Sequence, residues 1–168
     1  MFYSDGAAVY SYGIVHGLNK ASTVLDGLSN VNSMVVDQNR GFLFLGSPSK
    51  VDRYDLLVDV SSTVPTISVN RTSQLEVYTT NNQISTMTID ADQKVLYVSE
   101  LDQITAVYYK DFKEGDDQET KTLYEDIENV VSMAPDYAGN LYWGLSEGGL
   151  TDGAIVRGKA DSPNPDTT

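Results

Sequence analysis

The sequence predicts an all-β protein in which one antiparallel unit is repeated along the chain. Three observations predict this class. Short runs of β-branched and aromatic residues alternate with turns rich in Asp, Asn and Gly. One strand–turn–strand signature recurs roughly every 45 to 50 residues. No stretch shows the sustained 3.6-residue apolar spacing of an amphipathic helix.

Three copies of the unit align with little adjustment. Each has a first strand ending in Asp, a turn, an aromatic second strand and a short third strand. In chain order, the first strands are Ser33–Asp37, Thr86–Asp90 and Ser132–Asp136, the second are Gly41–Gly46, Lys94–Ser99 and Gly139–Gly144, and the third are Val51–Tyr54, Ile104–Tyr108 and Ala154–Arg157. Outer strands at Thr63–Val69 and Glu119–Tyr124 complete four-stranded sheets. A shortened copy opens the chain, where Phe2–Asp5 precedes Ala8–Tyr12.

Repeats of this length and content are typical of β-propeller blades, which stack around a central axis. We expect a propeller segment over residues 1–160, with blade units at about 1–30, 31–80, 81–128 and 129–160, and a flexible tail or linker over 161–168. Three whole blades and a partial one form part of a ring, expected to be six-bladed, which further chain or a partner chain completes. The alternatives are a β-sandwich, an open meander and a closed four-bladed ring.

Composition narrows the class of protein. A formal net charge of -13 argues against nucleic-acid binding, which needs surplus Lys and Arg. The longest apolar runs are only a few residues, so no membrane span is expected. Cysteine is absent. Asn70-Arg71-Thr72 is a sequon that favours a secreted glycoprotein, although no leader is visible in the chain.

Two stretches of the chain carry a family resemblance, namely Asn32–Phe42 with the later Tyr54-Asp55-Leu56, and Gly139–Leu145 with Ala154–Arg157. Both resemble blades of the yellow/major royal jelly protein family. Ser85–Tyr108 resembles the blade before the last of these. The resemblance covers most of Val31–Asp161 and lacks the family's first blades and its usual cysteines. It implies a propeller whose channel binds biogenic amines in some members, while others serve in storage or fibrous assemblies.

Residues for catalysis are scarce. His16 is the single histidine and has no cysteine or second histidine to pair with. At the positions where propeller hydrolases hold a divalent metal, the chain offers Asn32 as a plausible ligand, whereas Val131 cannot coordinate one. We therefore expect no metal, no cofactor and no catalytic set in these blades. The alternative is a lactonase- or tautomerase-like enzyme whose catalytic residues lie partly in missing blades.

A binding surface is the remaining expectation. Polar residues that open the first strands should ring the channel mouth, together with two carboxylates after the second strands that could attract an amine. These predicted ligand-binding residues are Asn32, Ser33, Ser85, Thr86, Glu100, Ser132 and Glu147. Met34, Met87 and Met133 are expected to pack between blades rather than to line the channel. The sequence thus predicts a non-enzymatic extracellular protein that binds a small cationic ligand or assembles with itself or another chain.

Overall fold

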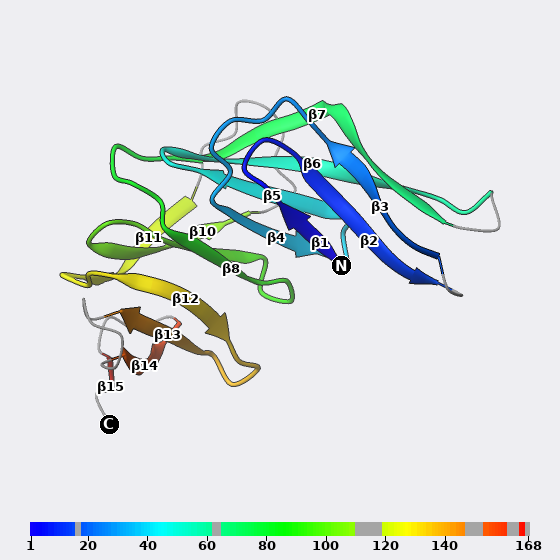
Figure 1. Cartoon of the computed structure of the whole chain (residues 1–168). Coiled ribbons are helices and arrows are strands. Elements are labelled where there is room, and N and C mark those ends of the chain that lie inside the picture. The colour runs from blue at the N-terminus through cyan, green and yellow to red at the C-terminus, as the bar shows by residue number, and fades with distance from the viewer. Residues whose placement is uncertain (16–17, 62–64, 110–118, 147–152, 161–164, 167–168) are drawn as a thin grey trace.

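The computed structural model describes residues 1–15, 18–61, 65–109, 119–146, 153–160 and 165–166 of the 168-residue chain. Within these ranges the chain forms strands, turns and bends, without a helix. The strands make four separate antiparallel sheets, which we call sheets A to D in chain order (Figure 1). The predicted all-β class and its repeated antiparallel sheets are confirmed.

Sheets A and B come from the first half of the chain. Sheet A contains β1 (Phe2–Ser4), β2 (Val9–Val15) and β3 (Leu18–Leu25). Sheet B contains β4 (Ser33–Asp37), β5 (Phe42–Ser47), β6 (Lys50–Asp59) and β7 (Thr66–Thr79). β7 runs past its predicted end at Val69, because residues 71–74 are accommodated as an irregularity in its ladder with β6.

Sheets C and D repeat the order of sheet B. Sheet C contains β8 (Thr86–Asp90), β9 (Val95–Ser99), β10 (Gln103–Tyr108) and β11 (Glu119–Glu125). Sheet D contains β12 (Val130–Pro135), β13 (Asn140–Ser146), β14 (Gly153–Lys159) and the two-residue β15 (Pro165–Asp166). Within every sheet, strands that are consecutive in the chain are neighbours.

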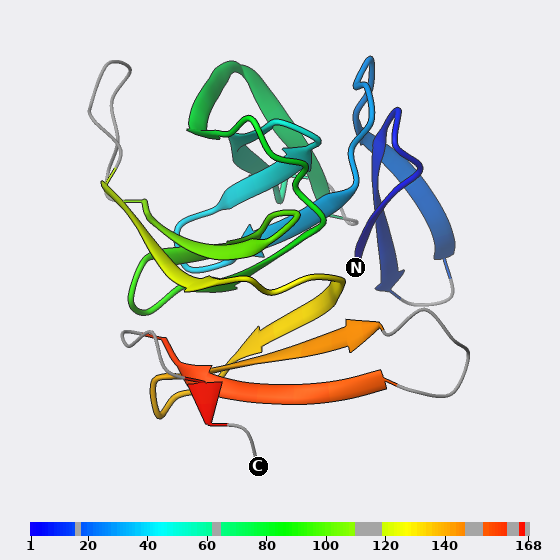
Figure 2. The ribbon, with the colours of Figure 1, turned by 90° about the vertical axis from the view of Figure 1, so that its left-hand side faces the viewer.

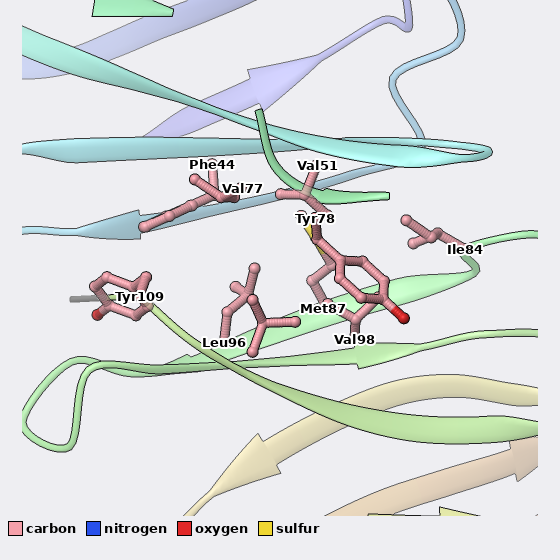
Figure 3. Close-up of a cluster of buried hydrophobic side chains, with 10 residues drawn as sticks. Phe44, Val51, Val77, Tyr78, Ile84, Met87, Leu96, Val98 and Tyr109 are labelled. Carbon is pink, nitrogen blue, oxygen red and sulfur yellow. The ribbon is translucent and has the colours of Figure 1, made fainter. Parts of the chain in front are cut away.

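The sheets pack face to face in chain order, so that sheet A lies at one end of the series and sheet D at the other (Figure 2). Strand β9 shows how the alternation of side chains produces this packing. Leu96 and Val98 point into the cluster shared with sheet B (Figure 3), whereas Val95 and Tyr97 point into the cluster shared with sheet D. An inner sheet is therefore buried on both faces, and its second strand reads as a continuous apolar run.

Methionine recurs at one register position and packs against the preceding sheet. Met34 packs against the cluster between sheets A and B, Met87 belongs to the cluster between B and C, and Met133 packs against the cluster between C and D. The expectation that these three side chains pack between sheets is confirmed.

The turn between the first and second strands is built on an aspartate in all four sheets. Its Oδ1 accepts two of the backbone N–H groups that follow, at 2.8 to 3.1 Å. The four aspartates are Asp5, Asp37, Asp90 and Asp136. The residues with positive φ in these turns are Gly6, Gly41, Lys94 and Gly139. One local device thus sets the hairpin in each repeat.

Candidate ligand and assembly sites

Two of the predicted channel residues join neighbouring sheets. Asn32 donates from Nδ2 to the carbonyl oxygen of Ile84 at 2.5 Å. Ser33 Oγ accepts the backbone N–H of Met87 at 2.9 Å. The first bond joins the segment before β4 to the segment before β8, and the second joins β4 to β8, so these side chains help to fix sheet B on sheet C.

Ser85 and Thr86 make their contacts inside sheet C. Ser85 Oγ donates to Ser99 Oγ at 3.1 Å and lies 3.3 Å from the Ser99 carbonyl oxygen. Thr86 faces Ser99 across the β8–β9 ladder. Of the predicted first-strand residues, Ser132 lines one of the three cavities described below.

Glu100 lies in the interior, 2% exposed. Thr80 and Thr105 donate their hydroxyls to its carboxylate at 2.6 and 3.1 Å, and Tyr78 donates its phenol. Burial alone would raise the pKa of Glu100, but the hydrogen bonds from its neighbours outweigh burial and hold the pKa below its ordinary value. Its carboxylate is thus ionised and already solvated by hydroxyls of the protein. The other predicted carboxylate, Glu147, lies outside the described residues.

Asn70 lies in β7, next to the irregularity in the β6–β7 ladder. Its Oδ1 accepts the backbone N–H of Thr72 at 3.1 Å and the Thr72 hydroxyl at 2.8 Å. The two polar positions of the sequon are therefore held together at the irregularity of β7.

The largest of the three cavities lies between the A–B connection and sheet B. Its volume is about 490 Å³, in the range of small-molecule pockets. Lys50 and Asp52 line it and form an ion pair, with Nζ 2.8 Å from Oδ2. Tyr54 and Gln74 add further polar groups to the lining. Sequence reasoning missed this cavity, because its wall combines the A–B connection with strands of the next sheet.

A second cavity of about 350 Å³ is acidic and lies at the Asp-turn ends of the first strands. Asp90, Asp92 and Asp136 line it together with Asn39 and Tyr137. Hydrogen bonds from the Asn140 side chain and backbone are the main cause that lowers the pKa of Asp136, to about 2. This end of the strands is opposite to the end where the sequence placed the channel mouth.

A third hollow, of about 250 Å³, lies on the outer face of sheet D. Ser132, Gly144 and Ile155 line it and face one another across β12, β13 and β14. The same row exists in the inner sheets, as Ser33–Gly46–Val51 in sheet B and Thr86–Ser99–Ile104 in sheet C. Val51 and Ile104 are fully buried, whereas Ile155 is 80% exposed. The row in sheet D is therefore the uncovered copy of a row that the next sheet covers elsewhere.

Among the residues that the structure describes, no group of three or more His, Cys, Asp or Glu side chains could hold a metal ion. The same residues also contain no helix with the length and apolarity that crossing a membrane requires.

Comparison with known proteins bears on the fold alone. No protein-family model matches the chain, and no curated protein sequence matches it significantly. In structure, 25 solved protein chains match it. One is the iodide structure of a Trichoderma reesei carbohydrate-active enzyme of family AA12, with a TM-score of 0.53 and 19% identity over 83% of this chain. The match covers 33% of that enzyme, so the chain spans about a third of its length.

Proposed function

We propose that the chain is an arc of a six-bladed β-propeller of the yellow/major royal jelly type and serves as a non-enzymatic, extracellular assembly protein. The uncovered outer face of sheet D supports this proposal. Ile155 is 80% exposed there and Val131 60%, while Ile104, at the matching position of sheet C, is fully buried. Exposed apolar patches on a folded protein commonly mark interaction surfaces. A propeller blade buries both faces, so further blades or a partner chain would cover this one.

Light scattering after size-exclusion chromatography tests the assembly function. Purified chain at increasing concentration should show a mass above the 18.4 kDa of one chain, since association follows mass action. A constant mass of one chain at every concentration would contradict it. The extracellular assignment has its own test at Asn70, where treatment with a deglycosylating enzyme should reduce the mass of the secreted protein.

Binding of a small amine is a second candidate function, and the acidic cavity favours it. Asp92 is exposed at this cavity, and Asp136, whose pKa is lowered to about 2, is ionised at physiological pH. Carboxylates of this kind attract and hydrogen-bond an ammonium group. The buried Glu100, already bonded to three hydroxyls, is less accessible to a ligand than this cavity.

Calorimetry with serotonin or dopamine tests the second candidate. Binding should weaken at least tenfold in Asp92→Asn, while Asp102→Asn, a change at another exposed carboxylate, should leave it unchanged. No heat with either amine, or equal affinity in both variants, would remove this candidate and leave the assembly function untouched.

A further inference from the structure

Ser47 in sheet B is the counterpart of the buried Glu100 in sheet C. Ser47 follows Gly46 at the end of β5, and Glu100 follows Ser99 at the end of β9. Gly46 and Ser99 hold matching places, since each lies opposite a fully buried residue of the next strand. A serine thus stands in sheet B where sheet C has a carboxylate.

The neighbours of these two positions correspond as well. Leu25 of β3 and Tyr78 of β7 each lie opposite a fully buried valine, at the point where the ladder shifts register. Asp52 of β6 and Thr105 of β10 each come directly after such a shift. Leu25 and Asp52 therefore stand at the A–B interface where Tyr78 and Thr105 stand at the B–C interface.

These replacements leave the A–B site open. At the B–C interface three hydroxyls donate to the Glu100 carboxylate, so the protein's own groups fill the site. Ser47 is shorter than Glu100, and Leu25 brings no hydroxyl. The cavity that Ser47 lines has about 490 Å³, far more than the roughly 30 Å³ that one water molecule occupies in the liquid.

Tyr54 supplies an unpaired hydroxyl to this cavity. Its side chain belongs to the cluster between sheets A and B, is 5% exposed and lines the cavity. Among the described residues, none forms a hydrogen bond with the Tyr54 hydroxyl. Burial, followed by the charge of Asp52, raises the pKa of Tyr54, so the phenol keeps its proton. A group that accepts a hydrogen bond from this hydroxyl would recover the free energy that its burial costs.

The two charges in the lining balance each other. Lys50 Nζ lies 3.1 Å from Asp52 Oδ1 and 2.8 Å from Asp52 Oδ2. The other polar side chains of the lining, besides Tyr54, are also neutral, namely Ser29, Asn30, Ser47, Ser49 and Gln74. An ionic ligand would have to break the Lys50–Asp52 pair or add a charge without a counterion, which is costly in a partly buried site. A neutral ligand is therefore favoured.

The ion pair still presents a donor beside an acceptor. The ammonium of Lys50 has three N–H groups, and the carboxylate of Asp52 has about four lone-pair sites, so neither is used up by the other. A hydroxyl group both donates and accepts a hydrogen bond. Two neighbouring hydroxyls of one ligand can therefore accept from Lys50 and donate to Asp52 at the same time.

We propose that this cavity binds a small neutral polyhydroxylated molecule, in the class of monosaccharides and cyclitols. Adjacent ligand hydroxyls bond to Lys50 and Asp52, and a third ligand oxygen accepts from Tyr54. The apolar part of the lining, which would contact the C–H groups of such a ring, consists of Leu28, Val31 and Leu45. The site is separate from both the acidic cavity and the outer face of sheet D, so this inference goes beyond the functions proposed above.

Calorimetric titration of the full chain with glucose and with myo-inositol tests the proposal and distinguishes a sugar from a cyclitol. At least one of the two should bind saturably, whereas acetate and glycine should not. Ser47→Gln places a side chain of the length of Glu100 in the cavity and should weaken binding at least tenfold. Tyr54→Phe keeps the ring and should weaken binding about fivefold, the value of one neutral hydrogen bond. Asp52→Asn should admit acetate, because Lys50 then lacks its counterion.

A control and a second variant keep the result decisive. Tyr3→Phe removes the hydroxyl of an exposed tyrosine on β1 and should bind like wild type. Tyr54→Phe alone decides the matter if Ser47→Gln fails to fold. No saturable binding of either polyol, or tighter binding of acetate or glycine than of both, would overturn the proposal. Affinity that is equal in wild type and Tyr54→Phe would place the polyol elsewhere on the protein and overturn this site.

Discussion

Gly46 and Gly144 hold the same place in sheets B and D and differ in what lies above them. Met87 of sheet C fills the space over Gly46, while the space over Gly144 is an open hollow of about 250 Å³. The third residue of each row shows the same contrast, since Val51 is fully buried and Ile155 is 80% exposed. The same residue pattern therefore has two consequences. Where the next sheet covers the pattern, it stabilises the fold, and where no sheet covers it, it leaves a surface for association.

The largest expected effect compares two isoleucines at one register position. Ile104→Ala should lower the free energy of unfolding by about 2 to 5 kcal/mol, because it leaves a cavity between sheets C and D. Ile155→Ala should change it by less than about 0.5 kcal/mol in the single chain, because the side chain is already largely in water. Urea unfolding of dilute protein measures both. Similar losses for the two would show that the row in sheet D is covered after all.

The next largest difference in stability is expected between substitutions of Gly46 and of Gly144. Gly46→Ala should cost about 1 to 3 kcal/mol, since the added methyl group presses on Met87, which is held in a packed cluster. Gly144→Ala needs only a movement of the Ser132 hydroxyl, so its cost should stay below about 1 kcal/mol. Thermal unfolding followed by circular dichroism ranks the two variants. A larger loss of stability in Gly144→Ala than in Gly46→Ala would show that the space over Gly144 is not open.

The repeated signature was enough to predict most of the strands, the Asp turns and the position of each methionine, but it did not predict β3 or β15. Asp90 and Asp136 accept hydrogen bonds from their own hairpins, so their role can be read from the local sequence. The role of Ser33 cannot, because its partner is the backbone of Met87 in another sheet. Glu100 illustrates the same limit: the sequence shows a carboxylate in a loop, and only the packing of β7 over it reveals a buried, hydroxyl-bonded group.

The stability of the covered faces should depend on alkaline pH through Tyr78, a member of the cluster between sheets B and C. Burial, followed by its hydrogen bond to Glu100, raises the pKa of Tyr78 to about 12. The unfolded chain loses this proton near pH 10, as an ordinary tyrosine does. The stabilisation is therefore complete below about pH 10 and is lost as the pH rises toward 12, because the unfolded state then binds fewer protons.

Tyr78→Phe should make the fall in stability above pH 10 shallower, whereas Tyr137→Phe, a change at an exposed ring, should leave the slope unchanged. Urea midpoints measured at several pH values give these slopes. Part of the slope should persist in Tyr78→Phe, since burial and then Asp37 raise the pKa of Tyr109 in the same cluster. Equal slopes for wild type and Tyr78→Phe would contradict the claim that the folded protein raises the pKa of Tyr78.

The smallest expected effect concerns the backbone energies of the hairpins in sheets B, C and D. Lys94 has a φ of 57°, where sheets B and D place Gly41 and Gly139. A side chain in this left-handed region costs roughly 1 kcal/mol, and glycine gives part of that back through the greater freedom of the unfolded chain. Lys94→Gly should therefore stabilise the protein by about 0.5 kcal/mol. Lys94→Ala is the matched control, because it removes the long side chain and keeps the strained φ. If alanine stabilised as much as glycine, the cost would lie in the contacts of the lysine, and the three hairpins would be equivalent in their backbone energies.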